Sequence, residues 1–108
     1  MNSIGSIVKI VENPCRKISS ENNITVEFRA EIPQIRNKAI VKLIFWGNLA
    51  GDVINYYKIN DYIMIEGYLF SQSKDASNLI KKESKEVQII VLKVYPFLLN
   101  VDHLNKKT

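Results

Sequence analysis

The sequence predicts an all-β fold, a five-stranded Greek-key barrel with one short helix between the third and fourth strands. Several segments alternate apolar and polar residues or are rich in β-branched and aromatic residues, as strands are, and one segment has the apolar spacing of a helix. The chain has 108 residues, of which 46% are hydrophobic and 24% charged, which suits one globular domain. We expect this domain to span residues 1–98 and a flexible basic tail to span residues 99–108.

The first two strands are expected over residues 4–11 and 24–32. The first segment is mostly apolar and ends in the turn-forming sequence Glu-Asn-Pro. A polar loop over residues 19–23 follows. In the second segment every other residue is apolar, and most of the residues between them are charged. This alternation predicts a strand with one buried face.

The third strand is expected over residues 39–47, which are rich in β-branched and aromatic side chains. The period then changes, because apolar residues recur at helical spacing between Leu49 and Tyr57. Asn48 is placed to cap the first turn, and Asn60 follows the end of the segment, where a left-handed residue is often needed. The sequence thus predicts one short amphipathic helix.

The last two strands are expected over residues 61–70 and 87–95. Alternate residues of the fourth strand should face the core and the outside. The expected inward residues are Ile63, Ile65, Gly67 and Leu69. The expected outward residues are Tyr62, Met64, Glu66, Tyr68 and Phe70. The fifth strand is apolar at nearly every position, so we expect cover on both of its faces, from the helix or from a partner subunit.

Composition and charge argue against several function classes. The net charge of +4 favours a polyanionic partner. No apolar run approaches the roughly 20 residues that span a bilayer, so no membrane partner is expected. The only histidine, His103, lies in the tail, and the only cysteine, Cys15, has no second ligand at metal spacing. With neither a catalytic triad nor a phosphate loop, we expect no enzyme, small-molecule substrate, metal or cofactor.

The segment 39–69, AIVKLIFWGNLAGDVINYYKINDYIMIEGYL, resembles the core of bacterial and organellar single-stranded-DNA-binding proteins. The shared pattern is a strand that ends in an aromatic residue and glycine (Trp46, Gly47), a small helix with a tyrosine near its end (Tyr56), and a strand that carries Ile-Glu-Gly at 65–67. The sequence looks most like the short plastid-encoded and cyanobacterial branch of that family. Its abundance of lysine, isoleucine and asparagine, typical of AT-rich genes, agrees with that branch.

The resemblance implies an oligonucleotide-binding (OB) fold and non-catalytic binding of single-stranded DNA in DNA maintenance or replication. It also implies a homodimer or homotetramer, located in a plastid whose genome encodes it or in a bacterial cytoplasm. Two departures imply weaker or more specialised binding. Ile40 and Lys74 stand where the family has tryptophans, and the chain ends in a basic stretch rather than in an acidic tip that recruits partner enzymes.

The expected binding surface is the face of the third strand that carries Lys42 and Trp46. A lysine is seldom buried without a partner, so Lys42 should point outward, and Trp46 shares its parity. Aromatic planes stack bases and cations track phosphates, which favours stacking by Trp46 over a core or interface position. Arg29 either joins this surface or pairs with Glu27 or Glu31.

Basic residues in two loops are expected to steer phosphates, the alternative being ordinary solvated charge. Arg36 and Lys38 lie between the second and third strands. Between the fourth and fifth strands lie Lys74, Lys81, Lys82 and Lys85. The outward stripe of the fourth strand is too apolar to leave in water, and we interpret it as a subunit interface, with Phe70 nearest the binding groove. Extension of the stacking surface is the alternative for this stripe.

Two other functions stay open. One is an RNA-binding module on the same barrel, because contacts to the 2′-hydroxyl, which distinguish RNA, cannot be read from a sequence. The other is an adaptor or assembly protein that kept the barrel but has little affinity for nucleic acid. In that case Trp46 would lie in a subunit contact.

Overall fold

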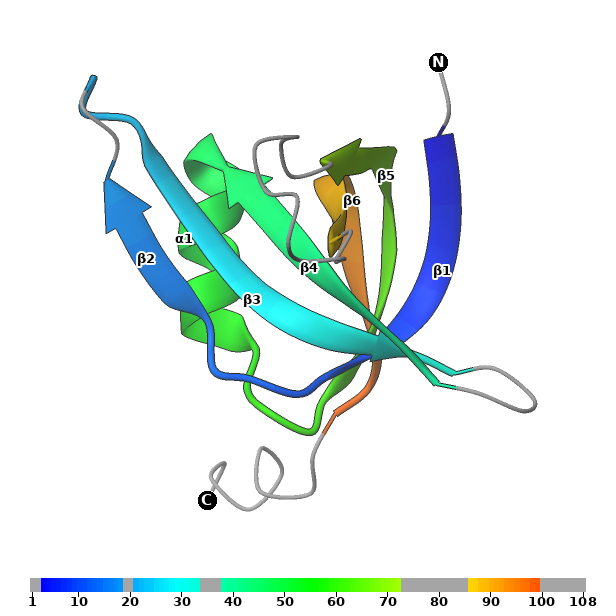
Figure 1. Ribbon diagram of the computed structural model, residues 1–108. Helices are drawn as coiled ribbons and strands as arrows, with labels where there is room; N and C mark the ends of the chain where they lie inside the picture. Colours follow the sequence, from blue (N-terminus) through cyan, green and yellow to red (C-terminus); the bar gives the residue numbers. More distant parts are fainter. Residues whose placement is uncertain (1–2, 19–20, 34–37, 73–85, 100–108) are drawn as a thin grey trace, which may run out of the picture.

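The computed structural model describes residues 3–18, 21–33, 38–72 and 86–99, and within these ranges it has six strands and one helix (Figure 1). The strands are β1 (Ser3–Ile10), β2 (Cys15–Ile18), β3 (Ile24–Ile32), β4 (Ala39–Trp46), β5 (Tyr62–Gln72) and β6 (Glu86–Leu98), and helix α1 (Gly47–Tyr56) lies between β4 and β5. The predicted barrel of five strands with one short helix is confirmed, with β1, β3, β4, β5 and β6 as the five. Residues 100–108 of the predicted tail lie outside the described residues, and the domain boundary stays a prediction.

The barrel closes through two-sided pairing of β1. The strand order in the sheet is β1-β5-β6-β4-β3-β2, and β1 pairs in addition with β3 at Lys9 and Ile10. β4 and β6 run parallel, whereas the other pairings are antiparallel. The sheet thus returns on itself, and five strands enclose the core.

The sequence does not predict β2. Its four residues are all exposed and show no apolar alternation. β2 pairs with β3 over Ile24 to Glu27, next to the point where β1 pairs with Ala30 and Glu31. It therefore supplies hydrogen-bond partners to the part of β3 that β1 does not reach.

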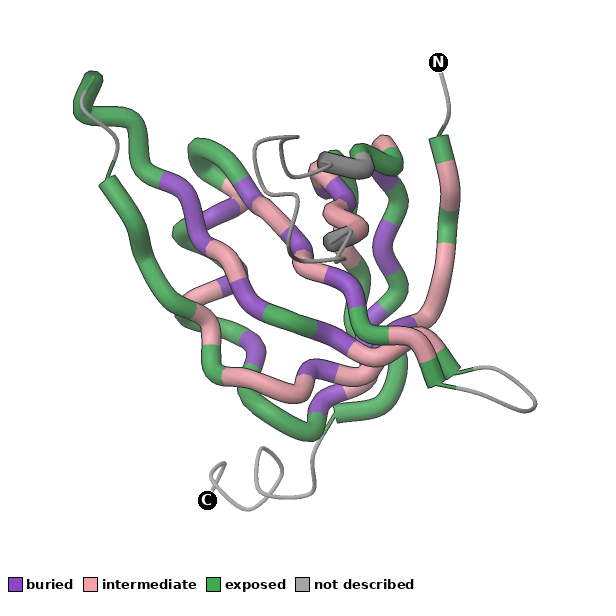
Figure 2. The backbone as a smooth tube through the Cα atoms, in the orientation of Figure 1, coloured by how far each residue is buried: buried purple, intermediate pink, exposed green. Residues whose placement is uncertain are grey.

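Alternate side chains of the strands fill the barrel, and buried and less buried residues follow each other along β3 and β4 (Figure 2). At the centre the rings of Phe28 and Phe45 stack with their centroids 5.2 Å apart. The predicted inward residues of the fourth strand are buried except for Leu69, which is exposed. Leu69 lies beyond Tyr68, the last residue of β5 that pairs with β1, so the barrel no longer covers it.

Helix α1 begins directly where β4 ends. Gly47 has a φ of +63°, a left-handed conformation that glycine adopts without steric cost, so the chain turns from strand to helix without a loop. The N-cap residue is Trp46, and no side chain caps the helix, so the predicted cap at Asn48 is wrong. Asn48 already lies in the first turn. Ala50 and Val53 are buried, and the helix packs on β2, β3 and β4.

The turn after α1 is tied to the end of β1. Asn60 has a φ of +78°, which confirms the predicted left-handed residue. Its backbone N–H donates to the carbonyl of Ile10 at 2.8 Å, and the Ile10 N–H donates to the carbonyl of Asp61 at 2.9 Å. The buried Asp61 carboxylate accepts the N–H of Lys58 at 2.8 Å. Burial raises the pKa of the Tyr57 hydroxyl and the charge of Asp61 raises it further, so this hydroxyl stays neutral at physiological pH.

β6 is buried on one face only. Ile89 and Val91 point into the barrel, whereas Leu92, Tyr95 and Phe97 are exposed. The helix does not cover this second face, since it packs on β2, β3 and β4. We expected both faces of this strand to be covered, but in the described part of a single chain its outer face stays exposed.

Candidate nucleic-acid interface

Three of the predicted binding residues lie in one row across the outside of the barrel. In the strand register Lys42 of β4 lies opposite Arg29 of β3 and opposite Gln88 of β6, and Gln88 lies opposite Phe70 of β5. Residues directly opposite each other project from the same face of a sheet. The row Phe70–Gln88–Lys42–Arg29 therefore carries an aromatic ring at one end and two cations at the other.

Trp46 lies on the same face, four residues along β4 from Lys42 and thus about 13 Å away. The alternation that the sequence predicts for this strand is confirmed, because Val41, Leu43 and Phe45 are buried in the barrel. Trp46 is 48% exposed. Its indole is therefore available to stack on a base, and equally to contact another subunit.

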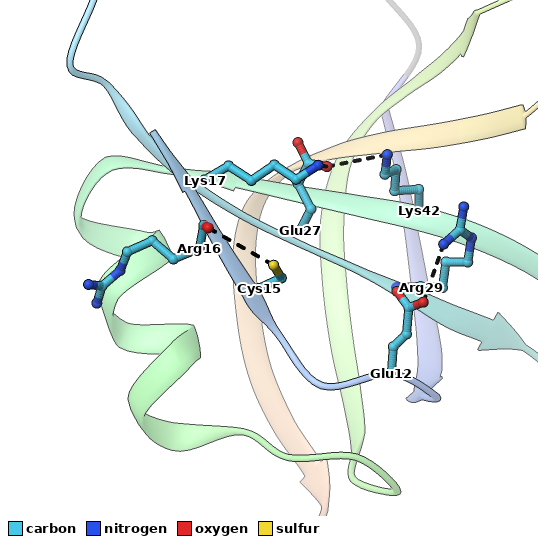
Figure 3. Close-up of polar contacts among 7 residues, drawn as sticks. All are labelled: Glu12, Cys15, Arg16, Lys17, Glu27, Arg29 and Lys42. Atoms are coloured by element: carbon cyan, nitrogen blue, oxygen red, sulfur yellow. Dashed lines mark hydrogen bonds and ion pairs between the residues drawn. The ribbon is translucent and has the colours of Figure 1, made fainter. Parts of the chain in front are cut away.

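Glu27 of β3 forms ion pairs with lysines on both neighbouring strands (Figure 3). Its Oε1 lies 3.3 Å from the Nζ of Lys17 on β2 and 3.2 Å from the Nζ of Lys42 on β4. The Glu27 side chain is only 18% exposed, so the carboxylate is largely covered. Lys42 thus points outward, as predicted, and is paired on this surface.

Arg29 has an acidic partner that the sequence does not predict. The partner expected from the sequence is Glu27 or Glu31, whereas Glu12, just after β1, accepts hydrogen bonds from the backbone N–H and the guanidinium of Arg29 (Figure 3). The Arg29 backbone N–H donates to Oε1 of Glu12 at 2.8 Å, and its Nη1 lies 3.2 Å from Oε2. The segment between β1 and β2 is thereby fixed against β3, and the Arg29 side chain stays half exposed.

The predicted loop cations are only partly described. Lys38 is exposed and lies 3.7 Å from Glu31, at the edge of the same face. The other loop cations lie outside the described residues. They are Arg36, Lys74, Lys81, Lys82 and Lys85.

A groove of about 490 Å³ opens over β3, beside the ion pairs. Its lining residues are Glu12, Asn13, Cys15, Lys17, Glu27, Phe28, Arg29 and Lys42. Lys17 and Glu12 are the residues of this surface that sequence reasoning missed. β2 gives no periodic signal from which the position of Lys17 could be predicted, and Glu12 reads as part of a turn.

A second patch lies on the outside of β1, β5 and β6, and its residues on β5 and β6 are exposed. Met64 of the predicted stripe lies opposite Ile7 of β1 and opposite Tyr95 of β6, and both Met64 and Tyr95 are exposed. Tyr62 lies opposite the exposed Leu98, and its ring lies 5.9 Å from the Nζ of Lys9. We call the residues Ile7, Met64, Tyr95 and Leu98 the apolar patch. Phe70, at the other end of β5, belongs instead to the row of Lys42.

Among the residues that the structure describes, no group of three or more metal-ligating side chains comes together. None of the helical segments in the described ranges has the length and apolar character needed to cross a membrane.

No family model matches the chain, but curated proteins with similar sequences are named as single-stranded DNA-binding proteins. The protein ycf41 of Trieres chinensis, named as a candidate single-stranded DNA-binding protein, is 36% identical over 110 residues, which cover 98% of this chain and 97% of the relative. The thylakoid-associated single-stranded DNA-binding protein slr1034 of Synechocystis is 34% identical over 73 residues, covering 64% of this chain and 57% of the relative.

Solved structures share the fold. The SSB domain of a Synechococcus protein superposes with a TM-score of 0.72 at 24% identity, covering 88% of this chain and 94% of that one. A small single-stranded DNA-binding protein from Streptomyces coelicolor gives 0.74 at 12% identity, covering 90% and 94%. The barrel is therefore an OB fold. With near-complete coverage of a relative at 36% identity, the chain belongs to the family of single-stranded-DNA-binding proteins, in its plastid and cyanobacterial branch.

Proposed function

We propose that this protein binds single-stranded DNA on the outer face of β3 and β4, and that it protects or organises exposed strands during DNA maintenance or replication. The observation that carries the proposal is the half-exposed indole of Trp46, on the same face of β4 as Lys42, which in turn lies opposite Arg29 on β3. The family is non-enzymatic, and this chain is not an enzyme.

The proposed mechanism combines stacking with phosphate neutralisation. Trp46 stacks on one base and Phe70 on another, because both rings are exposed on the outer face. The phosphate backbone of the DNA runs past Lys42, which shares a row with Phe70 and a strand face with Trp46, and past its neighbour Arg29 on β3. The proposal extends to Lys38, and to Arg36, Lys74, Lys81 and Lys82, as cations that steer phosphates from the loops.

Fluorescence titration tests this function directly, because Trp46 is the only tryptophan. An unstructured deoxyoligonucleotide should quench the emission, and the affinity should fall as salt rises, with a slope of about −0.7 in log K against log salt for each phosphate contacted. Absence of quenching and of binding even at low salt would contradict the proposal. An RNA oligomer of the same sequence, added as competitor, separates DNA binding from the RNA-binding alternative.

A homodimer or homotetramer is the assembly that we propose. The apolar patch supports it, since Met64, Tyr95 and Leu98 are exposed in the single chain beside the half-buried Ile7, and Met, aromatic and aliphatic side chains are enriched at subunit interfaces. We also propose a plastid location, or the cytoplasm of a cyanobacterium, from the relatives that match the chain.

Met64→Glu is expected to dissociate the oligomer, because it places a charge between Ile7 and Tyr95 in the middle of the apolar patch. Sedimentation equilibrium measures the change in mass. Tyr56→Glu adds the same charge on an exposed position of α1 and should leave the mass unchanged. A monomeric wild type, or an oligomer that Met64→Glu leaves intact, would rule out this patch as the interface.

A further inference from the structure

We propose that Glu27 is a built-in competitor of the bound strand. Its carboxylate occupies a phosphate site between Lys17 and Lys42, and a backbone phosphate must displace it before those two lysines can hold nucleic acid. This inference rests on the proposed function and adds to it a residue that sets the affinity. It also adds Lys17, on β2, to the binding surface.

The geometry of the three side chains supports the exchange. Both ammonium groups approach the same oxygen, Oε1 of Glu27, at 3.2 and 3.3 Å. Two ammonium groups held this close together need an anion between them, because they otherwise repel each other. Carboxylate and phosphate oxygens are both anionic acceptors for charge-assisted hydrogen bonds from lysine. A phosphate can therefore replace the carboxylate without any rearrangement of the strands.

Glu27 lies in the path that we propose for the bound DNA strand. Glu27 lies opposite Ile44 on β4, midway between Lys42 and Trp46 along the same face. Each step of two residues along a β-strand covers about 7 Å. A DNA strand that stacks on Trp46 and reaches Lys42 therefore passes Ile44 and, beside it on β3, Glu27. The groove of about 490 Å³ is open at this point. A negative charge there opposes every phosphate that approaches.

Glu12 is also an acidic residue on this surface, but it holds the backbone in place, whereas the ion pairs of Glu27 are with side chains. Glu12 accepts the backbone N–H of Arg29 as well as its guanidinium, so displacing it would loosen the segment between β1 and β2. The two partners of Glu27 shown by the ion pairs are lysine side chains, whose long aliphatic stems can turn toward a new anion. Exchange at Glu27 therefore leaves the backbone in place.

Glu27→Gln tests the proposal, because glutamine keeps the shape of the side chain and removes its charge. We expect this variant of the full chain to bind an unstructured deoxyoligonucleotide about 3- to 10-fold more tightly at low salt, since the strand no longer displaces two surface ion pairs. The salt dependence should steepen by about 0.7 to 1.4 in log K against log salt, which corresponds to one or two more phosphates neutralised. Anisotropy of labelled DNA measures both quantities.

Two further variants make the result specific. Asp52→Asn changes the net charge by the same amount at an exposed position on α1 and should leave affinity and slope close to those of wild type. In the Glu27→Gln background, replacing Lys17 and Lys42 by methionine should abolish the gain. Circular dichroism and thermal melting check that each variant is folded.

The possible outcomes separate the two proposals. Tighter binding with a steeper slope supports the competing role of Glu27, even where the wild type binds only weakly. If the wild type binds and Glu27→Gln binds equally well or less well, Glu27 organises the lysines instead, and the inference fails while the proposed function stands. If neither protein binds at the lowest salt, both are wrong.

Discussion

Trp46→Ala is expected to weaken binding of single-stranded DNA by about 5- to 150-fold, the loss that corresponds to one stacked base. Trp46 is half exposed at the end of β4, so its removal deletes stacking area without opening a cavity in the barrel. Trp46→Phe should keep most of the affinity, because it keeps an aromatic plane at the same place. Anisotropy of labelled DNA is the suitable measurement, since the alanine variant has no tryptophan to report on binding.

Tyr56→Ala is the matched control for this experiment. Tyr56 is also an exposed aromatic residue, but it lies on α1, and its removal should leave DNA affinity unchanged. Equal affinity of Trp46→Ala and wild type would show that the indole does not stack on bases. A change in oligomer mass in Trp46→Ala, without a change in affinity, would instead favour the adaptor function.

Gly67→Ala is expected to destabilise the protein by about 3 kcal/mol or more, at the upper end of what overpacking costs. A Cβ at this position would lie 2.1 Å from the carbonyl oxygen of Ile90 and 2.9 Å from Cα of Val91. Both atoms belong to the backbone of β6, at a place where the register between β5 and β6 shifts, so neither can turn aside as a side chain would. In a domain whose total stability is about 5–15 kcal/mol, this loss is large.

Thermal unfolding followed by circular dichroism measures the effect. For a domain of this size the loss corresponds to a fall of about 12 to 24 °C in the unfolding midpoint. Gly51→Ala is the matched control, because nothing lies within 4 Å of the added Cβ and the residue is in the interior of α1. Alanine should there stabilise the helix by up to about 1 kcal/mol. Equal midpoints for Gly67→Ala and wild type would mean that the two strands are further apart than described.

The sequence by itself determined which residues form most of the strands and, for β3, β4 and most of β5, which side of the strand faces the core. Alternation at period two is a local property, so the outward position of Lys42 and Trp46 could be predicted from β4 alone. The same holds for Asn60, whose left-handed conformation follows from its place after the helix. The Ile-Glu-Gly motif could be recognised in the sequence as part of a family pattern. The sequence does not show why a glycine is needed at position 67, which is that the backbone of β6 lies too close for a side chain.

Only the tertiary structure decided which residues from different strands meet. β2 forms along the edge of β3 that β4 does not occupy and that β1 does not reach. Its own four residues have no pattern that predicts a strand. For the same reason the pairing of Arg29 with Glu12, and of Glu27 with Lys17 and Lys42, could not be read from the sequence. Parity tells which face a side chain occupies, whereas its neighbour across the sheet depends on the register between strands that are distant in the chain. That register brings the Glu27 carboxylate between Lys17 and Lys42, and so decides how the charges of the candidate site are paired.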